Sequence, residues 1–150
     1  MRSIKWLALG IAATLAACNT GDKAAAKPDA AAPAKTFTIA MIAKSSTNPV
    51  FLSGRIGAEA AAAELTKSSG VTVKIDWLTP PSEDGTVQAQ RIAQAIDGGA
   101  NAILLSASDA GKVLGAVNEA ADRGVPVMTF DSDVPNSRRF SFYGGDDVAM

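Results

Sequence analysis

The sequence predicts an α/β protein built on a doubly wound parallel sheet. From Thr36 onward, short apolar runs alternate with stretches in which apolar residues recur every three or four positions. This is the pattern of strands that alternate with amphipathic helices. Most of the runs are continuously apolar, as expected of central strands that helices cover on both faces. One run alternates apolar with polar residues, which is typical of an edge strand with a wetter face.

The apolar runs predict the order of strands in the sheet. Residues 38–43, 102–105 and 125–130 are nearly continuous in apolar residues and predict central strands. Between residues 71 and 77, Val, Ile and Trp alternate with Thr, Lys and Asp, so this second strand is predicted at an edge. Residues 140–143 predict a short fifth strand. These features fit the doubly wound order 2-1-3-4-5.

Capping residues predict where the helices begin and end. Asn and Asp favour helix N-caps, Pro suits the first helical position, and Gly commonly follows the last turn. By these signals the helices run from Asn48–Pro49 to Gly70, from Glu83–Asp84 to Gly98–Gly99, and from about Asp109 to Gly124. The apolar stripes expected to face inward are Leu52, Ile56, Ala60 and Ala63, then Ala89, Ile92, Ala93 and Ile96, then Val113, Val117, Ala120 and Ala121.

Composition narrows the range of functions. The formal net charge is −1, and no run of basic residues interleaves with aromatic ones, which argues against nucleic-acid binding. There is no histidine, so the commonest general base and metal ligand is missing. The single cysteine, Cys18, has no partner for an internal disulfide. No catalytic residue, metal or cofactor is therefore predicted.

The N-terminus is predicted to be a lipoprotein leader. Residues 1–17 combine a basic start with an apolar run that small residues close, which is the layout of a signal peptide. The tetrapeptide Leu15-Ala16-Ala17-Cys18 resembles a bacterial lipobox. Cys18 is thus the expected lipidation site and would anchor the chain to a membrane. Residues 18–35, rich in Ala, Lys and Pro, are predicted to be a tether to a folded lobe at 36–145.

The loops after the strands are the expected binding region. Ligands of doubly wound sheets bind beyond the carboxyl ends of the strands, near the point where strand order reverses. This rule nominates residues 44–48, 106–109 and 131–133. The first of these loops has no glycine, which argues against a nucleotide phosphate site. Ser, Asn and Asp side chains bind hydroxyl groups, and a nearby Phe can cover an apolar sugar face, so a sugar or polyol is the favoured ligand.

Motifs in these loops resemble a known family. They are Thr47-Asn48-Pro49-Val50-Phe51, Ser106-Ala107-Ser108-Asp109, Gly124-Val125-Pro126-Val127 and Phe130-Asp131-Ser132-Asp133. In this order they resemble the ribose-binding-protein family of periplasmic type I solute-binding proteins, which serve sugar ABC transporters. The resemblance implies the N-terminal lobe of a two-lobe protein of the cell envelope, with the second lobe missing and residues 146–150 as the start of the hinge. It also implies ABC permease and ATPase subunits as partners.

The resemblance also assigns roles to individual residues. By position, Asn48 and Phe51 would contact the ligand, and Asp131 would bind sugar hydroxyls with Ser132 beside it. Further candidate contacts are Lys44, Ser45 and Asp109. The family has a second aromatic residue where this chain has Val50 and an arginine where it has Ser132, so ribose itself is a poor match.

Structural roles remain open for several of the same residues. Asn48 can cap its helix and also contact ligand, Phe51 can pack in the core, and Asp109 is better explained as a cap. Asp133 is expected to be a solvated turn residue, whereas Asp131 ends a buried strand and needs a partner to offset its desolvation.

Other functions also fit parts of the pattern. A lipid-anchored lobe of this kind could feed a membrane signalling partner instead of a transporter. The effector domain of a lac-repressor-type regulator shares the design, but a signal peptide stands where its DNA-binding helices would be. An enzyme would need a pair such as Lys44 with Ser45 or Ser46. One open lobe encloses little of a ligand, so weak binding by this lobe alone is expected.

Overall fold

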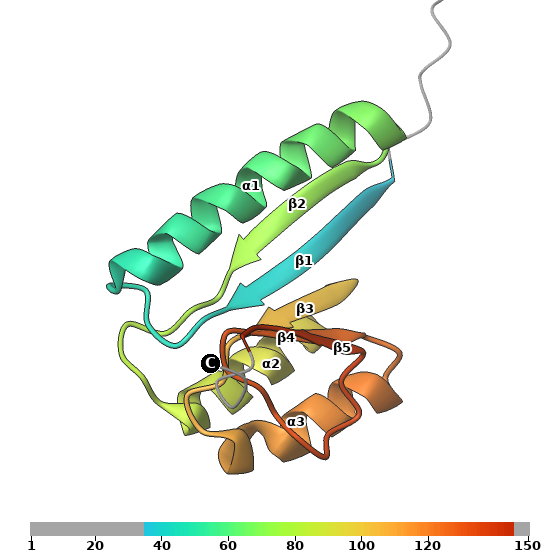
Figure 1. Ribbon diagram of the computed structural model, residues 1–150. Helices are drawn as coiled ribbons and strands as arrows, with labels where there is room; N and C mark the ends of the chain where they lie inside the picture. The colour runs from blue at the N-terminus through green and yellow to red at the C-terminus, as the bar shows by residue number, and fades with distance from the viewer. Residues whose placement is uncertain (1–34, 146–150) are drawn as a thin grey trace, which may run out of the picture. The chain divides into compact units, whose positions relative to one another are not determined.

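The structure is a computed structural model that describes residues 35–145 (Figure 1). The predicted leader, Cys18, most of the tether and residues 146–150 lie outside the described residues. The elements are β1 (Thr36–Ile42), α1 (Pro49–Ser69), β2 (Thr72–Trp77), α2 (Gly85–Asp97), β3 (Ala102–Leu105), α3 (Ala110–Asp122), β4 (Val127–Phe130) and β5 (Ser141–Tyr143).

The strands form one parallel sheet in the order β2-β1-β3-β4-β5, as predicted. The alternating strand β2 lies at one edge, and β5 lies at the other. Ile39 of β1 is in register with Ile75 on one side and Ala102 on the other. Because every pair is parallel, the carboxyl ends of β1, β3 and β4 lie side by side at one end of the sheet.

The helices lie on opposite faces of the sheet. Figure 1 shows α1 along β2 and β1 on one face, with α2 and α3 together on the other. The main core belongs to the face that α2 and α3 cover. Its fully buried members include Ile42, Ile103 and Leu105 from the strands and Ile92, Val113 and Val117 from the helices.

The prediction of which residues of α1 face inward is wrong. Leu52 is 38% exposed and Ile56 68% exposed, and the buried residues of the helix are Phe51 and Ala62. Ala60 and Ala63 are also exposed. The helix is so rich in Ala and Gly that several of its faces are comparably apolar, so spacing alone does not identify the one that packs on the sheet.

The stripe predicted for α2 needs one change. Ile92 and Ile96 are buried as expected, whereas Ala93 is exposed and Gln88 occupies a fully buried position instead. A buried polar side chain requires hydrogen-bond partners, and those of Gln88 lie in the loops described below.

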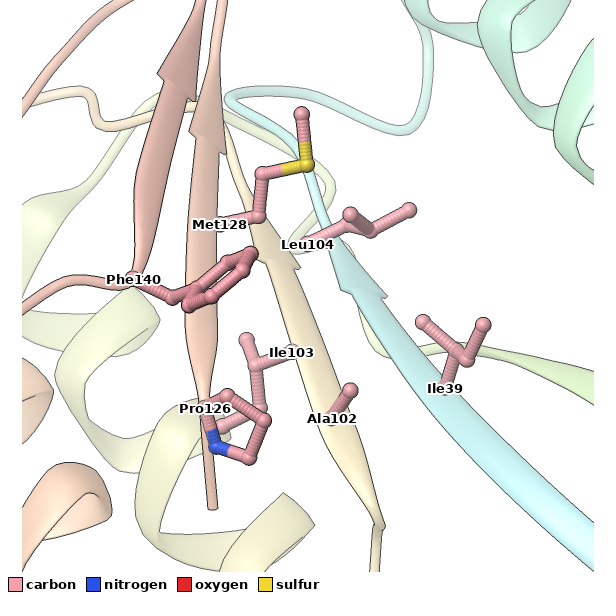
Figure 2. Close-up of a pocket in the computed structure, with 7 residues that line it drawn as sticks. All are labelled: Ile39, Ala102, Ile103, Leu104, Pro126, Met128 and Phe140. Atoms are coloured by element: carbon pink, nitrogen blue, oxygen red, sulfur yellow. The ribbon is translucent and has the colours of Figure 1, made fainter.

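The strands β3 and β4 are covered on only one face within residues 35–145, although continuous apolar strands predict two covered faces. On the α1 side they border a hollow of about 260 Å³ that is lined only by apolar residues (Figure 2). Its lining residues are Ile39, Ala102, Ile103, Leu104, Pro126, Met128 and Phe140. No helix among these residues is long and apolar enough to cross a membrane.

Candidate functional site

A charged cluster lies at the carboxyl ends of the central strands. Asp131 follows β4, Lys44 lies just beyond β1, and Ser106 follows β3. The Lys44 Nζ lies 3.2 Å from Asp131 Oδ2. The Ser106 hydroxyl donates to the same oxygen at 2.8 Å, and the Ser132 hydroxyl donates to it at 3.3 Å. The strand order therefore brings residues from the three nominated loops together, as the doubly wound rule predicts.

These contacts keep Asp131 ionised. Partial burial raises the pKa of its carboxyl, but hydrogen bonds from Ser106, Lys44 and Ser132 and the Lys44 charge outweigh it and hold the pKa below the ordinary aspartate value. The desolvation cost anticipated from the sequence is thus offset by the protein's own side chains.

One oxygen of the Asp131 carboxylate, Oδ1, is available to a ligand. The donors just described all act on Oδ2, and none of the side chains in residues 35–145 donates to Oδ1. The Asp131 side chain is 47% exposed and that of Lys44 is 22% exposed. Oδ1 can therefore accept hydrogen bonds from a ligand hydroxyl, and a hydrogen bond to a charged group contributes about 1.5–3 kcal/mol.

Gln88 supports this cluster and was missed in the sequence. Its Nε2 donates to the carbonyl oxygens of Ala43 (2.9 Å) and Ser106 (2.8 Å), and its Oε1 accepts from the Ser108 N–H at 2.8 Å. A signal was present, because Gln88 precedes Ile92 by four positions and so shares the inward face of the helix.

Asn48, at the end of the first loop, and Phe51, in the first turn of α1, both have structural roles. Asn48 caps α1, and its Oδ1 accepts from the Val50 N–H at 3.0 Å. Phe51 is 5% exposed and offers little surface to a ligand. Neither residue bonds to the Asp131 cluster, so their contact with a ligand remains a prediction.

Ser45 and Asp109 are likewise engaged elsewhere. The buried Ser45 hydroxyl donates to the Pro81 carbonyl at 3.0 Å and lies 2.9 Å from the Thr47 hydroxyl. Asp109 caps α3, where its Oδ1 accepts from the Lys112 N–H at 3.1 Å. The structure thus gives both residues roles in shaping loops.

The prediction that Asp133 is a solvated turn residue is wrong. Arg139 donates to its carboxylate through Nε (2.5 Å) and Nη2 (2.8 Å), and the Thr129 hydroxyl donates at 2.6 Å. The Arg139 hydrogen bond, aided by Thr129, lowers the pKa of Asp133 to about 2 against the effect of burial. This pair fixes the connection from β4 to β5 immediately beside the charged cluster.

The hollow in Figure 2 is unsuited to a sugar. It lies along the body of β3 and β4, and its lining side chains are all apolar. Sugar hydroxyls buried there would lack hydrogen-bond partners. Within residues 35–145, no group of His, Cys, Asp or Glu side chains is arranged to hold a metal ion.

Known proteins are similar to this chain in sequence and fold. The chain is 29% identical over 134 residues to the ribose import binding protein RbsB of Bacillus subtilis, which covers 89% of this chain and 42% of that protein. Among solved structures, LsrB from Clostridium saccharobutylicum in complex with AI-2 is 34% identical with a TM-score of 0.62, over 71% of this chain and 31% of that one. An ABC transporter solute-binding protein from Clostridium phytofermentas with bound L-rhamnose is 26% identical with a TM-score of 0.66, over 76% of this chain and 34% of that one.

The chain therefore spans less than half the length of each of these proteins. A family model described as the periplasmic binding protein domain matches residues 39–150, which include nearly the whole sheet and every residue of the charged cluster. The chain belongs to the periplasmic binding protein domain family.

Proposed function

We propose that this chain is a lobe of an extracytoplasmic receptor that binds a neutral, polyhydroxylated small molecule, a monosaccharide or a close relative, without catalysis. The observation that carries the proposal is the ionised Asp131 at the carboxyl end of β4, with Oδ2 held by Lys44 and Ser106 and Oδ1 open. This is the place where ligands of doubly wound sheets bind.

The charges of the site favour a neutral ligand. Lys44 and Asp131 carry opposite charges 3.2 Å apart, so the pair has no net charge to select an anion or a cation. A hydroxyl group can donate to the Asp131 carboxylate and also accept from the Lys44 ammonium. Two adjacent hydroxyls of a sugar could therefore use both members of the pair at once.

The ligands named for two of the three similar proteins support the same class. Ribose and L-rhamnose are sugars, and they are named for RbsB and for the solute-binding protein from C. phytofermentas. In the whole receptor we expect a second lobe to close over the sugar and an ABC permease with its ATPase to accept it. Cys18, lipidated after removal of residues 1–17, would hold the receptor at the membrane.

The contacts of Lys44 and Ser45 favour ligand binding over catalysis by these two residues. Lys44 is paired with Asp131, and the Ser45 hydroxyl is bonded to the Pro81 carbonyl. Neither is arranged with the other as nucleophile and base, which a hydrolase would require.

Replacing Asp131 tests the proposal. In the full chain, D-ribose and L-rhamnose would be titrated while amide NMR shifts are followed, a method that detects weak binding. Asp131→Asn removes the charged acceptor and should weaken binding of whichever sugar binds by about 10- to 100-fold, the equivalent of about 1.5–3 kcal/mol.

Asp97→Asn is the matched control. Asp97 is an exposed carboxylate paired with Arg123 at 3.3 Å, away from the charged cluster, and its replacement should leave sugar affinity unchanged. Equal affinity in wild type and Asp131→Asn would contradict the proposed site.

A further inference from the structure

We propose that Gln88 is a positioning residue of this site, and that its side-chain amide holds the two loops that bring Lys44 and Ser106 to Asp131. The inference rests on the proposed function for its biological meaning, but the geometry that supports it stands without a ligand.

The Gln88 side-chain amide lies just beyond the last backbone hydrogen bond between β1 and β3. The Ser106 N–H donates to the Ile42 carbonyl at 3.0 Å, which continues the strand pairing by one residue. Just beyond it lie the carbonyls of Ala43 and Ser106, and the two N–H groups of the Gln88 amide supply their donors at 2.9 and 2.8 Å. Gln88 therefore continues the connection between the two strands where the backbone no longer does.

Each carbonyl that Gln88 holds belongs to, or adjoins, a residue that binds Asp131. Ala43 directly precedes Lys44, whose Nζ lies 3.2 Å from Asp131 Oδ2. Ser106 itself donates to that oxygen at 2.8 Å through its hydroxyl. One buried amide thus fixes the main chain next to Lys44 and at Ser106, two of the three residues that donate to Asp131.

A third hydrogen bond satisfies the remaining polar atom of the Gln88 side chain. Gln88 Oε1 accepts from the Ser108 N–H at 2.8 Å, so both donors and the acceptor oxygen of the side chain are used. The residue is fully buried, and a buried polar network with every member satisfied favours one geometry over others. If Gln88 only filled space, Met would replace it without effect on the loops.

The test compares Gln88→Met with Ile92→Ala in the full chain. Met keeps the length of Gln and removes all three hydrogen bonds. Ile92 is fully buried one turn later on α2, so its truncation loosens the core without breaking a bond to either loop. The readout is the titration of the Asp131 carboxyl carbon by NMR, with no ligand present.

In Gln88→Met the pKa of Asp131 should rise toward the ordinary aspartate value, because Lys44 and Ser106 are no longer held against it. In Ile92→Ala the pKa of Asp131 should stay below the ordinary aspartate value. The same Asp131 titration in Gln88→Met as in wild type would overturn the proposal, since Gln88 would then only pack.

A measurement on the wild-type chain covers the case in which Gln88→Met does not fold. The Gln88 side-chain amide resonances should shift as Asp131 titrates, whereas those of Gln90, exposed on the same helix, should not. A Gln88 amide that does not respond would overturn the proposal.

The sugar titration separates this inference from the proposed function. If neither D-ribose nor L-rhamnose shifts the Asp131 resonance in wild type, the proposed function fails for these sugars, and the link from Gln88 to Asp131 is still decided by the carboxyl titration.

Discussion

Asp131 has a left-handed backbone conformation, with φ at 59°. Such a φ is uncommon outside glycine, although Asp tolerates it better than most residues. The Asp131 N–H donates to the Tyr143 carbonyl at 3.1 Å, which ties this turn to β5. The conformation therefore belongs to a fixed turn, and it presents a charged side chain at the carboxyl end of the sheet where a ligand would bind.

Asp133 should make the stability of the lobe depend on acid pH. Its pKa is about 2 when folded against an ordinary value of 3.8, so the folded state favours the ionised form. The resulting stability is complete above the unfolded pKa and is lost as pH falls from about 4 to about 2. It amounts to about 2 kcal/mol.

Urea unfolding at several pH values checks this prediction. Asp133→Asn should be less stable at neutral pH and should lose less stability than wild type on acidification. Parallel pH profiles for the two proteins would show that the Arg139 pair does not stabilise the fold.

Single residues were predictable where one local rule determines their role. Asn48 and Asp109 match helix-cap patterns, and Asp131 stands out as an acid at the end of a buried strand. The pairing of Lys44 with Asp131 was not predictable, because it depends on the distance between loops far apart in the chain. The role of Asp133 was missed because Arg139 reaches it from the far end of an irregular connection.

Helices α2 and α3 approach closely at their N-termini. A Cβ on Gly85, the first residue of α2, would lie 2.9 Å from Asp109 Cβ and 3.1 Å from Lys112 Cβ. This spacing is too short for an unstrained contact, so the absence of a side chain at Gly85 allows α2 and α3 to begin this close together.

Gly85→Ala should therefore destabilise the lobe, by about 1–3 kcal/mol for an overpacked site. Gly57→Ala is the matched control, because a Cβ there meets no atom within 4 Å and alanine favours a helix interior, which should stabilise by up to about 1 kcal/mol. Urea unfolding measures both variants. Equal stability in the two would contradict the close approach of α2 and α3.

The elements themselves followed from the sequence, because continuous and alternating apolar runs distinguish central from edge strands and capping residues place the helix ends. The pattern of apolar residues did not identify the face of α1 that packs against the sheet. Its Ala and Gly residues make a nearly uniform surface, and the choice of Phe51 and Ala62 depends on tertiary contacts.

The proposed lipid anchor at Cys18 can be tested by cell fractionation. Cys18→Ser removes the thiol that would carry the lipid, so the protein should move from the membrane to the soluble fraction. Thr20→Ser is the control and should remain with the membrane. Membrane association that persists in Cys18→Ser would contradict lipid anchoring.

A crystal structure of the chain grown with L-rhamnose would show whether a neutral sugar binds at Asp131. Sugar density is expected beyond the carboxyl ends of β3 and β4, with one hydroxyl within hydrogen-bond distance of Asp131 Oδ1 and another near Lys44 Nζ. Sugar bound in the apolar hollow beside Phe140, with Asp131 and Lys44 untouched, would contradict it.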